Sequence, residues 1–143
     1  MYKRLFHYLI AFLPLLFGGL LYVFFRNENI LFFSWLRFFG ISYSYHQYTN
    51  IINDGIASYV IYSLPNGLWV LSGLLFLNIA LKREYQLLKI YSVIFIGIAF
   101  IIEIGQLFKI IRGTFCILDF VTIILFSSIG LFVNIRKVKY EKN

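Results

Sequence analysis

Four long runs of apolar residues, each bounded by polar or charged positions, dominate the sequence. They cover about residues 5–25, 56–81, 90–111 and 117–135. A helix of about 20 apolar residues crosses the roughly 30 Å hydrocarbon core of a bilayer. The pattern therefore predicts an all-α integral membrane bundle of four transmembrane helices, forming a single domain over residues 1–143. Pro65 lies inside the second run and is expected to kink that helix or to mark its true start.

The longest connection, residues 26–54, contains one further apolar run. Its sequence ILFFSWLRFF, from Ile30 to Phe39, is too short to span a bilayer and includes Arg37. Aromatic residues favour the membrane–water interface, so we expect a short interfacial helix in this first outer loop. The stretch YSYHQYTNIIND that follows is aromatic and polar, as is typical of a loop at the membrane surface.

Composition supports the membrane assignment and excludes several classes of function. The chain is 61% hydrophobic and 13% charged, whereas soluble domains average roughly 45–50% and about 25%. The net charge of +7 comes from basic residues that flank the apolar runs, so a nucleic-acid partner is not expected. A single cysteine, Cys116, excludes an internal disulfide, and with two histidines it disfavours a zinc site. No metal or cofactor is expected.

The distribution of basic residues predicts the orientation. Nine of the 13 lysines and arginines lie before the first run, between the second and third runs, or after the fourth; four lie in the other two connections. Positively charged loops remain in the cytoplasm, so both termini are predicted to be cytoplasmic. The first run follows Lys3 and Arg4 without a small-residue cleavage site, which favours a retained anchor. A multi-pass protein of a bacterial inner membrane is the expected localisation.

This orientation gathers polar residues at the non-cytoplasmic ends of the spans. The candidate ligand-binding residues are Glu103, Gln106, Arg112, Asp119, Trp69, Asn66 and Asp54. An ionisable residue within a span costs roughly 2.5–3.5 kcal/mol on insertion scales, and it usually pairs or faces a wet cavity. Arg112 is the natural counter-ion for Glu103, Asp119 or both, and its planar guanidinium can also bind an anionic group such as phosphate.

The third and fourth runs are predicted to form a tight hairpin. Gly113 permits a left-handed backbone, and the hydroxyl of Thr114 can cap the next helix. Three interpretations of the polar cluster remain open: an ion-pair network that only locks this hairpin, a site for a ligand or lipid headgroup, or acid–base catalysis by Glu103 and Asp119. Catalysis is less favoured because no nucleophile is evident beside the two carboxylates.

The polar cluster resembles a known family. The sequence E-x-x-Q at Glu103–Gln106, followed by Arg112 and by Asp119 at the start of the last helix, resembles the VanZ-like family of small bacterial membrane proteins. The run L-P-x-G-L-W at Leu64–Trp69, preceded by Asp54, resembles compact members of that family. Family members often carry an acidic residue where this chain has Cys116, and Asn where it has Ile123.

The resemblance implies a role in the cell envelope. The founder of the family is associated with low-level resistance to the glycopeptide antibiotic teicoplanin, without an established enzymatic activity. The leading expectation is a VanZ-like envelope protein that binds a membrane lipid or lipid-linked amphiphile at the polar cluster. Alternatives are a membrane-embedded hydrolase or transferase that uses Glu103 and Asp119, and a structural or assembly subunit that associates with other membrane proteins.

Overall fold

The computed structural model describes residues 2–25, 38–40, 55–81, 84–111 and 115–141. Within these residues the regular structure is entirely α-helical, as predicted: α1 (Tyr2–Phe25), α3 (Gly55–Tyr62), α4 (Leu64–Ala80), α5 (Tyr85–Leu107) and α6 (Ile117–Glu141). Four spans in this part of the chain are long and apolar enough to cross a membrane, with α3 and α4 together making the second. The interfacial helix predicted at residues 30–39 lies, apart from its last two residues, outside the described part.

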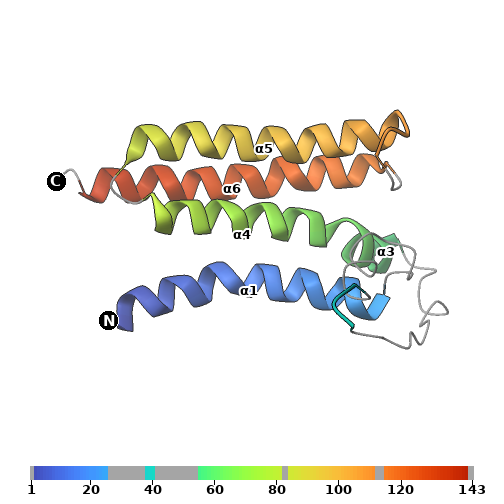
Figure 1. The fold of residues 1–143 in the computed structure, drawn as a ribbon, viewed down its shortest axis with the longest axis horizontal. Coiled ribbons are helices and arrows are strands. Elements are labelled where there is room, and N and C mark those ends of the chain that lie inside the picture. The colour runs from blue at the N-terminus through green and yellow to red at the C-terminus, as the bar shows by residue number, and fades with distance from the viewer. Residues whose placement is uncertain (1, 26–37, 41–54, 82–83, 112–114, 142–143) are drawn as a thin grey trace.

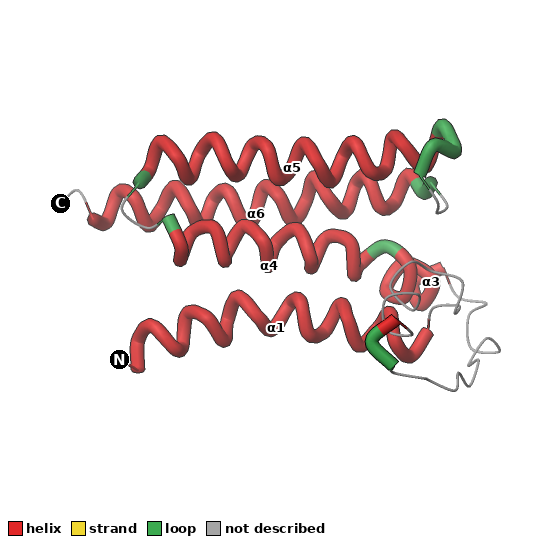
Figure 2. Tube along the Cα trace, viewed as in Figure 1, coloured by secondary structure: helices red, strands yellow, loops and turns green. Residues whose placement is uncertain are grey.

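The helices form an elongated bundle in which α4 is central (Figure 1). Helix α4 packs most extensively on α1 and α6, while α5 lies against both α4 and α6. The start of α1 and the end of α6 lie at one end of the bundle, and α3 lies at the other (Figure 1). We call the first the terminal end and the second the α3 end. The tube in Figure 2 shows that the chain reverses between α5 and α6 at the α3 end.

The second span is interrupted where the sequence places Pro65. Helix α3 ends at Tyr62, and α4 begins at Leu64 with Pro65 in its first turn. Proline has no backbone N–H and fits the first turn of a helix, where N–H groups lack helical partners. The N–H of Ser63 still donates to the Tyr59 carbonyl (2.9 Å), and the N–H of Asn66 donates to the Ser63 carbonyl (3.2 Å). The break is therefore a tight hydrogen-bonded turn, and of the two expected roles of Pro65 it starts a new helix.

The third span differs from its predicted limits of 90–111. It begins five positions earlier, at Tyr85, and ends at Leu107. Two hydrogen bonds close its end, from the Ile110 N–H to the Gly105 carbonyl (2.8 Å) and from the Lys109 N–H to the Gln106 carbonyl (3.0 Å), with Lys109 at φ 57°. This is the Schellman pattern, in which a left-handed residue stops the helix. The stop comes before Gly113 and Thr114, which lie outside the described residues.

Close helix contacts depend on small residues, as in other membrane bundles. A Cβ added to Gly18 of α1 would lie 2.7 Å from the indole nitrogen of Trp69 on α4. One added to Gly130 of α6 would lie 2.6 Å from a methyl group of Leu74, a residue with no exposed surface. These glycines let the backbones of α1 and α6 approach opposite sides of α4.

The apolar surface is consistent with a lipid environment. Helices α1 and α5 expose large hydrophobic side chains over much of their length, among them Leu13, Phe17, Val93 and Ile101. The fully apolar interior is small and centres on Val70, Leu74 and Ile123. Such an inside-out distribution would be unstable in water but suits hydrocarbon, because lipid tails solvate apolar side chains. The chain thus has the architecture of a multi-pass membrane protein.

Candidate functional site

The level of each residue along the bundle follows from contacts between helices. Three contacts join α4 to α6 with an almost constant offset in sequence: Gly67 to Thr122, Leu74 to Gly130, and Asn78 to Asn134. A constant offset means that the two helices run in the same direction and in register. It places Asp119, three residues before Thr122, at the level of the break around Ser63.

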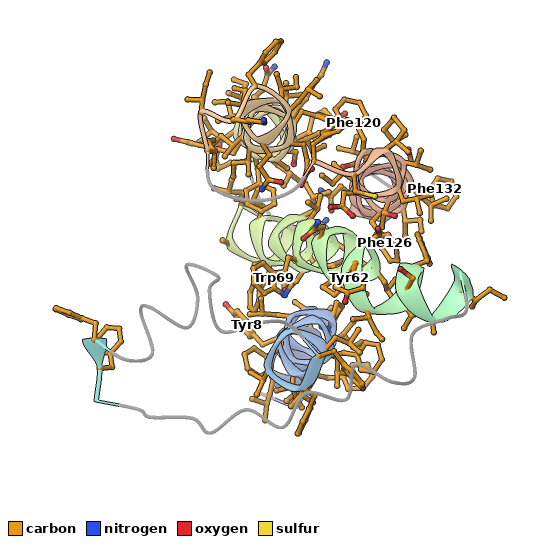
Figure 3. All side chains as sticks on the ribbon, turned by 90° about the vertical axis from the view of Figure 1, so that its right-hand side faces the viewer. Tyr8, Tyr62, Trp69, Phe120, Phe126 and Phe132 are labelled. Carbon is orange, nitrogen blue, oxygen red and sulfur yellow. The ribbon has the colours of Figure 1, made fainter. Side chains whose placement is uncertain are left out.

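Helix α5 runs the opposite way and is aligned by two aromatic contacts. Phe95 packs against Gly73 of α4, and Phe100 lies against Phe120 of α6 with ring centroids 4.7 Å apart. Figure 3 shows Phe120 on the side of α6 that faces α5. The second contact places Glu103 within about one helical turn (5.4 Å) of the level of Asp119. The structure therefore brings the two carboxylates to the same end of the bundle.

Glu103 also points toward the other helices. On α5, Phe95 faces α4 and Phe100 faces α6. At 3.6 residues per turn, the side chain of Glu103 leaves the helix axis at an angle between those of these two phenylalanines. Only 4% of its surface is exposed. Glu103 thus lies in the groove between α4 and α6 instead of facing lipid, as expected for a carboxyl group within a span.

Asp119 is buried to the same extent, with 4% of its surface exposed, in the first turn of α6. A carboxylate here is favoured by the partial positive charge at a helix N-terminus, an effect worth about 0.3–1 kcal/mol in exposed helices. This local preference explains why an aspartate is tolerated at the start of an apolar span. The helix dipole does not account for the burial of Asp119. The burial results from the packing of α6 on α4 and α5.

Two hydroxyl groups extend the polar cluster toward α3. The Thr122 hydroxyl donates to the Leu118 carbonyl (2.7 Å) and shares a hydrogen bond with the Tyr59 hydroxyl (3.1 Å). Because Thr122 has one hydroxyl proton, the second bond takes its proton from Tyr59. This bond links α3 to α6 one turn from Asp119. Ser63, with 1% exposure, is buried at the same level.

Tyr59 was missed by the sequence reasoning, although its spacing carries a signal. Tyr59, Ser63 and Asn66 are separated by four and three residues, so they share one face when the break is treated as a helical turn. Of the predicted site residues on α4, Asn66 is half-buried and lies on the face toward α5, between the directions of Val70 and Gly73.

Trp69 lies elsewhere. It packs on Gly18 of α1, whereas Gly67 faces α6 from the other side of α4. Figure 3 shows Trp69 between the ribbons of α4 and α1. Its indole therefore fills the α1–α4 contact and is separated by the width of α4 from the α6 side of the cluster. By the offset between α4 and α6, Trp69 also lies about five residues, or about 8 Å, from the level of Asp119 toward the terminal end.

The remaining predicted residues flank the cluster. Gln106 is half-buried one turn beyond Glu103, and its carbonyl takes part in the stop of α5. Arg112 and Asp54 lie outside the described residues. Arg112 follows Ile111, whose side chain covers Gly105. Among the described residues, no group of three histidine, cysteine or acidic side chains is arranged to bind a metal ion.

These residues form what we call the acid cluster: Glu103, Asp119, Thr122, Tyr59, Ser63 and Asn66. It offers carboxylate and hydroxyl oxygens and one amide group, which suit a ligand with hydrogen-bond donors or positive charge. Comparisons of the chain with protein-family models, with curated proteins and with solved structures found no match.

Proposed function

We propose that this is a cell-envelope membrane protein, resembling the VanZ-like family, that binds the polar headgroup of an amphiphile at the acid cluster. The observation that carries the proposal is the burial of two carboxylates from different helices, Glu103 and Asp119, at one level and at one end of an apolar bundle. The headgroup would present amine or hydroxyl donors to them, and its acyl or prenyl chains would remain in the outer leaflet.

Energetics supports a role beyond packing. Two ionisable residues cost about 5–7 kcal/mol if each contributes the roughly 2.5–3.5 kcal/mol of insertion scales. This is comparable to the entire stability of a typical folded protein, about 5–15 kcal/mol. A structural lock between α5 and α6 could be made more cheaply from apolar residues, because replacing buried ion pairs by apolar groups is often neutral or stabilising. A ligand that uses the carboxylates accounts for their presence.

The binding experiment uses three matched acid-to-amide variants. The protein is purified into nanodiscs containing phosphatidylethanolamine or a polyprenyl-linked sugar, whose headgroups carry amine or hydroxyl donors, and the bound probe lipid is quantified by native mass spectrometry. Glu103→Gln and Asp119→Asn should reduce retention of a probe at least tenfold. Glu84→Gln makes the same chemical change at an exposed position at the terminal end and should leave retention unchanged.

Thermal stability of the same samples separates binding from a structural role. If both amide variants retain each probe as the wild type does and only their unfolding temperature changes, the cluster is a lock and the proposal is wrong. If they bind normally but lose turnover of a bound probe, the cluster is catalytic. Teicoplanin susceptibility of a deletion strain complemented with each variant tests the phenotype that the resemblance implies.

We further propose that the acid cluster faces the outside of a bacterial inner membrane and that both termini are cytoplasmic. The charge distribution supports this orientation. Cys116 is half-buried at the α3 end and is the only cysteine, so it serves as a native probe. A membrane-impermeant maleimide should label it in spheroplasts, whereas a cysteine introduced at Glu84 in a Cys116→Ala background should react only after lysis. The reverse pattern would contradict the orientation.

A further inference from the structure

A second group of buried polar residues lies closer to the terminal end, apart from the acid cluster. Ser92 of α5 and Ser127 and Asn134 of α6 are exposed by only 1%, 5% and 5%. The hydroxyl oxygens of both serines and the side-chain nitrogen of Asn134 are inaccessible and have no hydrogen-bond partner among the described residues. Buried polar atoms are nearly always hydrogen-bonded, to protein or to an ordered water molecule.

The geometry brings these three side chains to the interface where α4, α5 and α6 meet, which we call the groove. On α5, Ser92 lies between the directions of Phe95 and Phe100, as Glu103 does, and so points between α4 and α6. On α6, Ser127 lies between Gly130, which contacts α4, and Phe120, which contacts α5.

The same contacts give the levels of the three side chains. The contact of Phe100 with Phe120 places Ser92 at about the level of residue 128, between Ser127 and Asn134. Asn134 closes the groove through its oxygen, which accepts a hydrogen bond from the Asn78 amide (2.6 Å). The three side chains therefore follow one another along a single groove.

Ser92 and Ser127 also differ from the other hydroxyl residues near them, Thr122 and Ser128 of α6. A serine or threonine in a helix can donate to the carbonyl four residues earlier, which satisfies its proton locally. Thr122 and Ser128 do so, at 2.7 and 2.8 Å. Ser92 and Ser127 have no such bond in the structure. Their hydroxyl groups remain available to a partner in the groove.

This group is separate from the acid cluster. Ile123, with 2% exposure, packs with Val70, and both lie between the level of Thr122 and that of Ser127. The apolar cluster interrupts the polar groove, so a ligand at Glu103 and Asp119 would not reach Ser127. The bundle has a polar site toward each end and an apolar layer between them.

We propose that Ser92, Ser127 and Asn134 line a second binding site for neutral hydroxyl oxygens. One oxygen lies at Ser92 and Ser127, and another lies at Asn134, which is about two helical turns (about 10.5 Å) from Ser127. The three residues are uncharged, and the amide nitrogen of Asn134 can only donate, so the ligand atom at Asn134 must accept a hydrogen bond. A serine hydroxyl can donate or accept, and a ligand that also donates would satisfy both serines. An oxygen bearing hydrogen meets these requirements. It comes either from an ordered water molecule or from the hydroxyl group of an amphiphile.

The first test uses adjacent serines as matched variants. Ser127→Ala and Ser128→Ala remove the same hydroxyl and gain the same helix propensity, but only Ser127 faces the groove. If the site is occupied, Ser127→Ala should raise the unfolding equilibrium constant about threefold to tenfold relative to Ser128→Ala, the loss expected for one hydrogen bond. If the hydroxyl has no partner, its removal relieves an unsatisfied group, and the constant falls to or below that of Ser128→Ala. This second result would overturn the proposal.

The second test identifies the source of the oxygen. The protein is labelled with ¹⁵N, and nuclear Overhauser spectra are recorded in detergent and in lipid nanodiscs. The side-chain amide protons of Asn134 should show a cross-peak to protons of the bound water or amphiphile. A cross-peak to water in both media assigns an ordered water molecule. A cross-peak to lipid hydroxyl or glycerol protons only in nanodiscs assigns an amphiphile. Absence of both cross-peaks would contradict the site, whatever the result of the acid-cluster experiments.

Discussion

Replacing Gly67 by alanine tests the contact that holds α4 against α6 beside the acid cluster. An added Cβ would lie 2.5 Å from the Thr122 methyl group and would also overlap the ring of Phe126. Thr122 is fully buried and branched at Cβ, so it cannot easily move away. Overpacking of this kind costs about 1–3 kcal/mol. Alanine in place of glycine within a helix returns about 1 kcal/mol.

Gly97 of α5 provides the matched control, because an added Cβ there would meet nothing within 4 Å. Gly97→Ala should therefore stabilise the protein by about 1 kcal/mol. The helix-propensity gain cancels in the comparison, so Gly67→Ala should be about 1–3 kcal/mol less stable than Gly97→Ala. Unfolding in mixed micelles with increasing sodium dodecyl sulfate, followed by tryptophan fluorescence, measures this difference. If the two variants agree within about 0.5 kcal/mol, the close packing of α4 on α6 is wrong.

Three further substitutions test individual bonds by the same unfolding assay. Tyr59→Phe removes the bond to Thr122 and should cost about 0.5–1.5 kcal/mol, since Thr122 keeps its bond to its own helix; no loss would mean that α3 is not held by this bond. Asn78→Leu leaves the Asn134 oxygen unpaired and should cost about 1–3 kcal/mol, with a smaller loss when both residues become leucine; equal losses would contradict the pair. Lys109→Gly should stabilise by about 1 kcal/mol, because glycine accepts the left-handed conformation at φ 57°.

The number of spans was predictable from the sequence because hydropathy and length reflect the thickness of the bilayer. The interruption near Pro65 was also predictable, since proline removes a backbone donor in any context. The end of α5 was not. Lys109 adopts a left-handed conformation that lysine rarely takes, and the hydrogen bonds that stabilise it form only in the folded turn.

For the site, the sequence predicted the level of the residues better than the direction they face. Glu103 and Asp119 were placed at one end because Glu103 lies near the end of the third apolar run and Asp119 near the start of the fourth. Trp69 was predicted at the same end but packs on α1, and only the positions of neighbouring helices reveal this. The pairing of Asn78 with Asn134 depends equally on the register of α4 with α6.

The interruption between α3 and α4 has a consequence for the depth of the acid cluster in the membrane. Helix α4 has 17 residues, which at about 1.5 Å per residue gives about 25 Å, less than the roughly 30 Å hydrocarbon thickness. The turn at Ser63 must then lie below the surface of one leaflet, where irregular backbone is tolerated only against protein or water. Burial of Ser63 and Pro65 meets this requirement. Asp119 lies at the level of Ser63, so a headgroup bound at the acid cluster would also lie below the surface of that leaflet.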